Sequence, residues 1–329
     1  MTTLKELAKL LNVSVSTVSK ALSNAPDIGE DTKKRVKELA DALNYQPNKM
    51  AVGLKGSKTN TIGVVIPDIL NPYFAEVLYG IEQRALKSGY DILVNISNEN
   101  TNKEIKGIET LKIGRVDGFI VAPSIQTIQQ SDYSHIHDLN KNKKLVLFDR
   151  VIDNVDCDKV SIDDEKAVNE ATQYFIDKGF KKIAFVSNIS ALTLGKKREH
   201  GYQTALKNAG INLDSSLVLE IESIDTAHNQ MKEFLSKEVP EAVICADNSS
   251  GIMIQSVARS ILDKNQSLFP IISFGNKKTA NLAYPRLNYI NQNAQKMGEK
   301  AAELLINHIE NASNHTATNF IQDTELVLS

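Results

Sequence analysis

The chain begins with MTTLKELAKLLNVSVSTVSKALS (residues 1–23), a stretch that predicts two short helices separated by a tight turn. One face of the first helix is expected to pack inward, because apolar residues recur there at helical spacing: Leu4, Leu7, Ala8 and Leu11. Asn12 and Val13 form the predicted turn. Asn is the non-glycine residue that best tolerates the left-handed backbone such a turn needs.

The second helix carries many hydroxyl groups on its outer face. Ser14 is a suitable N-cap, and the residues expected to face inward are Val18, Ala21 and Leu22. Those expected to face outward are Val15, Ser16, Thr17, Ser19 and Lys20. Ser and Thr are poor helix-interior residues, but they gain where a helix touches base edges and phosphates. The pattern favours a DNA-reading helix-turn-helix over the alternative, a small helical bundle with a solvated face.

The start of the chain is basic and the rest is acidic. Residues 1–58 hold ten Lys and Arg against six Asp and Glu, whereas the whole chain has a net charge of −2. A basic head on an acidic body is consistent with a head that meets phosphate. A third helix is predicted over 31–44, Pro47 follows it, and the Lys- and Gly-rich residues 49–60 are interpreted as a linker.

From Thr61 onward, apolar strands alternate with amphipathic helices such as Tyr73–Ser88. Runs such as IGVVI, KLVLF and KIAFV are typical of parallel strands that are buried on both faces. The alternation predicts a doubly wound α/β body, and its length together with a break near 151–158 predicts two lobes. The expected strands are Thr61–Asp68, Tyr90–Ser97, Gly118–Ser124, Leu145–Arg150, Lys182–Asn188, Ala242–Asn248 and Ile271–Asn276.

Short polar side chains stand at the carboxyl ends of these strands. Ligands of open α/β sheets bind beyond those ends, so the side chains are expected to face a shared cleft together with Arg198. Each one alone is equally well explained as a turn former or a helix cap, but as a set they favour ligand binding. They are Asp68, Ser97, Ser124, Asp149, Arg150, Ser187, Asn188, Asp247, Asn248 and Asn276, the last of which follows Gly275.

The sequence gives little support for an enzyme, a metal-binding protein, or a membrane or secreted protein. The sequence contains no GxSxG, Walker, HExxH or GxGxxG motif, so no enzyme and no cofactor is expected. His135 and His137 are interpreted as part of a solvated loop rather than as a metal site, and Cys157 and Cys245 as buried free thiols. No apolar run approaches the ~20 residues that cross a bilayer, and no signal peptide is evident, so a cytoplasmic protein is expected.

The motifs together resemble the lactose-repressor (LacI) family of bacterial transcription factors. The similar segments are TLKELAKLLNVSVSTVSKALSN, DTKKRVKELADALNYQPN, TIGVVIPDILNPYFAEVLYGIE, RVDGFIVAPS, IDKGFKKIAFVS, REHGYQTALKNAGI and PRLNYINQNAQKMGEKAAELL. The resemblance implies a homodimer, with a tetramer also open, whose heads read a palindromic operator. It also implies a core like periplasmic sugar-binding proteins. The expected division is a head over 1–46, a hinge over 47–60 and a core over 61–329, with lobe 1 about 61–158 and 291–321 and lobe 2 about 159–290 and 322–329.

The resemblance also implies which residues meet DNA. Val15, Ser16 and Lys20 match base-reading positions, and Ser14, Thr17 and Ser19 would cap the helix or contact phosphate. Lys20 stands where many members have Arg, which softens base discrimination because Lys lacks the rigid fork. The hinge positions implied are Tyr45, Asn48, Leu54 and Lys55, of which Leu54 matches the leucine that wedges into the minor groove. Val52-Gly53 replaces the usual Arg-Ser before that leucine.

In the core, the resemblance implies an effector site that contains Tyr73, Phe74, Asp149, Arg198, Asp247 and Asn276. Gly275 replaces the usual Asp after Phe274, so either Asn276 takes over its role or the ligand differs in its hydroxyl pattern. The expected effector is a sugar or sugar derivative. A nucleobase or a phosphocarrier protein remains an alternative, as does a transport-type binding protein, which the DNA head argues against.

Overall fold

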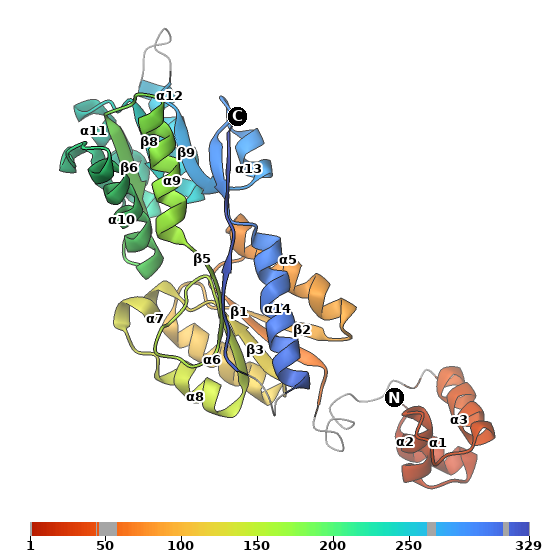
Figure 1. Ribbon diagram of the computed structural model, residues 1–329. Coiled ribbons are helices and arrows are strands. Elements are labelled where there is room, and N and C mark those ends of the chain that lie inside the picture. Colours follow the sequence, from red (N-terminus) through yellow and green to blue (C-terminus); the bar gives the residue numbers. More distant parts are fainter. Residues whose placement is uncertain (1, 44, 46–57, 262–267, 312–315, 329) are drawn as a thin grey trace. The chain divides into compact units, whose positions relative to one another are not determined.

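A computed structural model describes residues 2–43, 45, 58–261, 268–311 and 316–328. The chain forms two compact units, Met1–Thr59 and Asn60–Ser329, which we call the head and the core. Figure 1 shows the elements of both units. No helix within the described ranges is both long and apolar enough to span a membrane.

The head consists of three helices, α1 (Leu4–Leu11), α2 (Val15–Leu22) and α3 (Glu30–Ala42). Asn12 adopts the left-handed conformation with φ 54°, as the predicted turn requires. A small apolar cluster fills the interior of the head. Leu22, which was expected to face inward, is only partly buried against this cluster. The buried members of the cluster are Leu7, Ala8, Val18, Ala21, Val36 and Ala40.

The first lobe of the core contains a six-stranded sheet of order β11-β5-β4-β3-β1-β2 whose described pairings are all parallel. Its strands are β1 (Thr61–Ile66), β2 (Asp91–Ile96), β3 (Gly118–Val121), β4 (Lys144–Phe148), β5 (Asp158–Ile162) and β11 (Asn319–Gln322). Its helices are α5 (Pro72–Lys87), α6 (Thr101–Ile113), α7 (Ile125–Gln130), α8 (Ser134–Asn142) and α14 (Ala294–Glu310).

The second lobe repeats this design with a sheet of order β12-β10-β9-β8-β6-β7, in which the edge strand β12 is antiparallel to β10. Its strands are β6 (Ile183–Ser187), β7 (Val218–Glu220), β8 (Ala242–Cys245), β9 (Ile271–Gly275), β10 (Asn288–Asn291) and β12 (Glu325–Val327). Its helices are α9 (Asp164–Asp177), α10 (Thr193–Asn208), the short 3₁₀ helix η1 (Ser215–Leu217), α11 (Ile224–Lys237), α12 (Asn248–Ile261) and α13 (Lys277–Leu282). The predicted doubly wound α/β core is confirmed.

Helices cover both faces of each sheet, because alternate strand residues point to opposite sides. In the first lobe, Val64 and Val146 share a buried cluster with Val77 of α5 and Met297 of α14. The intervening Val65 belongs to the cluster on the other face. Residues buried on both faces explain why these strands are almost continuously apolar.

Five strands were not anticipated from the sequence, and one of them moves a lobe boundary. β5 pairs with β4 in the first sheet, so the chain first leaves this lobe after Ile162 and not near Asp158. β10 and β12 belong to the second sheet, whereas α14 and β11 belong to the first lobe. The other missed strand, β7, is a three-residue edge strand. Such short or polar edge strands carry little periodic signal.

His135 and His137 do not lie in a solvated loop as expected, because both are part of helix α8. The His135 side chain is largely buried, and its Nε2 lies 2.7 Å from Oε1 of the fully buried Glu104. Helix α8 packs on the first sheet, which carries His135 into the polar core of the lobe. Within the described residues no cluster of His, Cys, Asp and Glu could hold a metal ion. Cys157 and Cys245 are buried free thiols, as expected.

Candidate functional site

The hydroxyl-rich face of the head is organised by its cap. The Ser14 hydroxyl accepts a hydrogen bond from the Thr17 backbone N–H at 3.0 Å, and the two side-chain oxygens lie 2.8 Å apart. Val15 and Ser16 are exposed, whereas Thr17 and Ser19 are half-buried. Ser14 and Thr17 therefore stabilise the start of α2, which leaves Val15 and Ser16 as its exposed leading residues.

Lys20 is exposed on the same helix and forms an ion pair with Asp27. The hydrogen bond and charge of Lys20 hold the pKa of Asp27 below its usual value. An exposed ion pair of this kind is weak, so a phosphate or a base can compete for the lysine. Tyr45 is half-buried against the core of the head. Three residues expected to contact DNA lie outside the described ranges, namely Asn48, Leu54 and Lys55.

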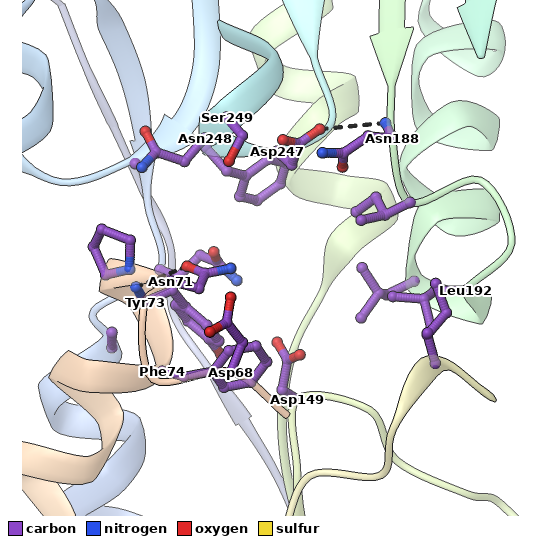
Figure 2. A pocket seen from close by; sticks show the side chains of 18 of the residues that line it. Asp68, Asn71, Tyr73, Phe74, Asp149, Asn188, Leu192, Asp247, Asn248 and Ser249 are labelled. Carbon is purple, nitrogen blue, oxygen red and sulfur yellow. Dashed lines mark hydrogen bonds between the residues drawn. The ribbon is translucent and has the colours of Figure 1, made fainter. Parts of the chain in front are cut away.

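An open cavity of about 430 Å³ lies between the two lobes of the core. Figure 2 shows side chains from both lobes that line it. Its volume is in the range of small-molecule sites. The lining residues follow the carboxyl ends of strands in both sheets, where open α/β sheets bind ligands. All six residues predicted for the effector site line this cavity: Tyr73, Phe74, Asp149, Arg198, Asp247 and Asn276.

On the first lobe, Asp149 and Tyr73 stand side by side. Asp149 follows β4 with a left-handed backbone of φ 60°, a conformation that costs energy for a residue other than glycine. Tyr73 lies in the first turn of α5, where its N–H donates to the capping Asn71 side chain at 3.0 Å. Burial, followed by the Asp149 charge, raises the pKa of Tyr73 well above its ordinary value. Tyr73 is therefore a neutral hydroxyl at physiological pH.

Phe74 and Arg150 line the cavity on the side of the first lobe. The Arg150 guanidinium lies 5.5 Å from the centre of the Phe74 ring and makes two parallel hydrogen bonds to Glu99, at 2.6 and 2.7 Å. Glu99 also accepts the Ile125 N–H at 2.7 Å. This bidentate pair fixes both side chains at the cavity.

On the second lobe, Arg198 is buried and stacked over Phe274, with 3.5 Å between the guanidinium carbon and the ring centre. Its Nε donates to Asp164 at 2.7 Å and its Nη1 donates to the Ala246 carbonyl at 2.6 Å. Burial raises the pKa of Asp164, an effect that the Arg198 charge opposes. Arg198 is therefore held rigidly, with its position set by elements α9, α10 and β9.

Asp247 already serves a structural purpose. One oxygen accepts the Ser250 N–H at 2.9 Å, and the other accepts the Ser250 hydroxyl at 2.6 Å and the Asn188 N–H at 3.4 Å. Burial raises the pKa of Asp247 in spite of these donors. Asp247 thus caps the first turn of α12 and also lines the cavity. It is therefore both a helix cap and a cleft residue, the two explanations offered for such strand-end side chains.

Asn276 connects the two lobes. Its side-chain Nδ2 donates to Glu76 of α5 at 2.9 Å, and its Oδ1 accepts the Thr279 N–H at 2.8 Å as the cap of α13. Glu76 belongs to the first lobe and Asn276 to the second, and both line the cavity, so this hydrogen bond joins the lobes at the cavity.

Three strand-end serines do not line the cavity, although they were expected to face it. Ser97, Ser124 and Ser187 are fully or almost fully buried. Ser124 caps α7 by accepting the Thr127 N–H at 3.3 Å, and the Ser187 hydroxyl accepts the Ile189 N–H at 3.2 Å. The alternative explanation, that strand-end serines form turns and caps, is correct for these two.

Sequence reasoning missed several lining residues, which stand in loops, on helices or after strands that were not predicted. Gln292 follows β10, is buried, and its Nε2 has no hydrogen-bond partner among the described residues. Asn188, which was predicted to face the cleft, also has a buried Oδ1 without a hydrogen-bond partner among the described residues. The other missed lining residues include Asn71, Glu76, Glu99, Leu192, Ile221, Glu222, Ser249 and Asn291.

Comparisons with known proteins agree with this architecture. Residues 3–48 match the family described as bacterial regulatory proteins, lacI family. Residues 59–327 match periplasmic binding proteins and sugar binding domain of LacI family. The HTH-type transcriptional repressor PurR of Photobacterium profundum is 29% identical over 332 residues, which cover 100% of this chain and 98% of the relative.

Solved structures share the fold. A Lac repressor dimer bound to operator and the anti-inducer ONPF superimposes with a TM-score of 0.85 at 18% identity, covering 99% of this chain and 98% of that one. The complex of the transcriptional regulator CelR with cellobiose has a TM-score of 0.72 at 22% identity and covers 100% and 99% of the two chains. The chain therefore belongs to the LacI family and is a DNA-binding transcriptional regulator.

Proposed function

We propose that this regulator is a homodimeric repressor whose operator affinity is controlled by a sugar or sugar derivative bound in the cavity between its lobes. The observation that carries the proposal is the composition of that cavity. Asp149 of the first lobe and Arg198 of the second line the same space of about 430 Å³. A ligand that contacts both favours one arrangement of the lobes over others, and this differential affinity is what couples a ligand to a second site.

The polar groups of the cavity support a polyhydroxylated ligand. Asp, Asn and Arg side chains bind neighbouring hydroxyl groups in pairs, because each presents two donor or acceptor atoms in a fixed geometry. The amide side chains of Asn188 and Gln292 line the same cavity. Apolar side chains, among them Phe74 and Leu192, offer surfaces for the C–H faces of a sugar ring.

DNA recognition is proposed for the exposed side of α2. Val15, Ser16 and Lys20 would read base edges, Ser14, Thr17 and Ser19 would cap the helix or contact phosphate, and Tyr45 would contact phosphate at the hinge entrance. Asn48, Leu54 and Lys55 complete the proposed set. Two heads on a homodimer would then read the two halves of a palindromic operator.

Exposed apolar side chains support the homodimer. On α5, Tyr79 and Leu86 are 54% and 63% exposed. On the second lobe, Ile252 of α12 is 40% exposed, and Leu282 and Tyr284 are 87% and 76% exposed. Large exposed apolar side chains on both lobes are candidates for a subunit interface, where a partner would cover them.

The test uses the full-length protein and an operator selected from random DNA. Thermal-shift screening against sugars and nucleobases is expected to find a stabilising sugar, and adding that sugar should change operator affinity in fluorescence anisotropy. If only nucleobases stabilise the protein, the proposed effector class is wrong. If a stabilising sugar leaves operator affinity unchanged, the proposed control is wrong.

A further inference from the structure

We infer that the cavity accepts uncharged or cationic polyhydroxylated ligands and rejects anionic ones, such as sugar phosphates and sugar acids. This inference rests on the proposed function and narrows its ligand class. It follows from the balance of charged side chains around the cavity and from how each of them is already paired.

The described lining residues carry many more acidic than basic groups. They include two guanidinium groups and six carboxyl groups, with no lysine and no histidine. Carboxylates that surround a cavity with low-dielectric walls attract cations and repel anions. The charged lining residues are Arg150, Arg198, Asp68, Glu76, Glu99, Asp149, Glu222 and Asp247.

Neither arginine offers an unbalanced positive charge. Arg150 is held by both oxygens of Glu99, at 2.6 and 2.7 Å. Arg198 is held by Asp164 at 2.7 Å and by the Ala246 carbonyl at 2.6 Å. Both side chains are at most 8% exposed, and withdrawing a guanidinium from a buried pair leaves a buried charge unpaired. Each arginine can donate a hydrogen bond to a hydroxyl, but its charge is already neutralised.

Most of the carboxyl groups that line the cavity are not neutralised by a positively charged side chain. Within the described residues, Asp68, Glu76, Glu222 and Asp247 form no ion pair with a lysine or arginine. Asp68 accepts the Leu70 N–H at 2.8 Å and Glu76 accepts the Asn276 amide at 2.9 Å, bonds that leave their charge in place. An incoming phosphate or carboxylate would therefore meet like charges.

Helix N-termini are the usual binding sites for anions, and several helices begin at this cavity. On three of them a side chain of the protein already accepts one first-turn N–H. Asn71 accepts the Tyr73 N–H at 3.0 Å on α5, and Asn276 accepts the Thr279 N–H at 2.8 Å on α13. On α12 the Ser250 N–H at 2.9 Å is taken by Asp247, which is itself a carboxyl group. Helices α10 and α14 also begin at the cavity and have no side-chain cap among the described residues, so each offers about half a positive charge, which offsets only part of the charge of the four carboxylates without an ion pair.

The charge of the cavity can be measured without knowing the effector. Ser249 lines the cavity at the first turn of α12, and Ser260 is exposed near the other end of the same helix. Full-length Ser249→Cys and Ser260→Cys proteins are each treated with a cationic trimethylammonium-ethyl and an anionic sulfonatoethyl methanethiosulfonate. The native Cys157 and Cys245 are buried, which limits their reaction. The ratio of cationic to anionic rates is compared between the two variants.

We expect this ratio to be roughly tenfold higher for Ser249→Cys than for Ser260→Cys, since charged clefts change local ion concentrations by ~10-fold or more. The ratio should fall when Asp68→Asn and Glu222→Gln are added to Ser249→Cys. An equal or lower ratio at Ser249, or no effect of removing the two carboxylates, would overturn the inference.

A matched panel then separates this inference from the proposed function. Full-length protein is screened with glucose, glucosamine, glucose 6-phosphate and glucuronate, and with the corresponding ribose and galactose compounds. Stabilisation by the neutral or amino forms supports the inference, whereas stabilisation by the phosphate or acid forms alone contradicts it. A cation-preferring cavity that binds no sugar of any charge would support the inference while contradicting the proposed sugar effector.

Discussion

Among single residues, Lys20 combines exposure on α2 with an ion pair that it must give up to meet DNA. We predict that Lys20→Ala weakens operator binding by roughly 1–3 kcal/mol and relaxes discrimination at one base pair of each half-site. The physical reason is the loss of a cation that can reach guanine O6 and N7. Fluorescence anisotropy with the operator, with single-base variants and with random DNA measures both effects.

Lys55→Ala is the matched control, because it removes the same charge at a position expected to touch only phosphate. It should weaken operator and random DNA alike. If Lys20→Ala also weakens both DNAs to the same extent, Lys20 is not a base reader.

Arg198 is proposed to contact the effector, and it also holds Asp164 in a buried ion pair. Arg198→Ala should abolish the response of operator binding to the effector, while operator affinity without effector stays nearly unchanged. It should also lower stability by ~3–5 kcal/mol, because Asp164 loses its buried partner. Arg198→Ala that keeps a full response at the wild-type midpoint would place the effector elsewhere. Asp149→Asn should weaken the response more mildly, since Asn keeps an acceptor and tolerates φ 60°.

The loss of stability in Arg198→Ala should depend on pH. Burial already raises the pKa of Asp164, and removal of Arg198, which opposes that shift, raises it further. A carboxyl group with a raised folded-state pKa binds its proton more tightly when folded, so stability falls as pH rises through that pKa. Urea unfolding should therefore show a smaller difference from wild type at pH 5 than at pH 8. A difference that grows toward acid pH would contradict this account.

At the scale of elements, the first lobe depends on a close crossing of α5 and α14, which lie side by side in Figure 1. A Cβ on Gly298 would lie 2.0 Å from the Val77 carbonyl oxygen, and one on Gly80 would lie 2.0 Å from the Gln295 carbonyl oxygen. Backbone atoms cannot move aside as a flexible side chain can. We predict that Gly298→Ala lowers the free energy of unfolding by roughly 1–3 kcal/mol.

Lys296→Ala on the same helix is the control, because Lys296 is exposed and its replacement should stay within about 0.5 kcal/mol of wild type. Urea unfolding followed by circular dichroism measures both variants. Gly298→Ala with wild-type stability would mean that the two helices can separate at no cost.

The hydrogen bond between Glu76 and Asn276 joins elements of the two lobes, α5 and the cap of α13. We predict that Glu76→Ala raises the ligand-free radius of gyration, because a hydrogen bond contributes about 0.5–1.5 kcal/mol to the closed arrangement. Glu76→Gln keeps an acceptor and should resemble wild type. Small-angle scattering of the full-length proteins tests this, and identical curves for wild type and Glu76→Ala would rule out a role for this bond in lobe closure.

For the whole molecule, the exposed apolar side chains on both lobes predict a homodimer. Tyr79→Glu combined with Ile252→Glu should produce a monomer in sedimentation velocity and should weaken operator binding, because one head reads only one half-site. Leu213→Glu is the control, since Leu213 is 49% exposed but lies outside α5 and α12. A wild-type protein that sediments as a monomer while it binds the operator would contradict the prediction.

Local sequence determined the elements that carry a regular pattern. Apolar residues at helical spacing predicted α1, α2 and α5, and buried apolar runs predicted β1, β4 and β6, because their side chains pack at a fixed period. Strand ends pointed to Asp149, Asp247 and Asn276, with Arg198 nearby, and the family resemblance added Tyr73 and Phe74. All of these line one cavity, since parallel sheets bring the carboxyl ends of their strands together.

Only the tertiary structure decided which of these side chains are already paired. Arg150 meets Glu99, 51 residues away, and Asn276 meets Glu76, 200 residues away. It also decided that β5 joins the first sheet and that His135 lies against Glu104. Such contacts depend on strand order and on how helices cross, which no local period encodes. The sign of the cavity's charge therefore follows from the fold, because composition alone does not reveal which charges neutralise each other.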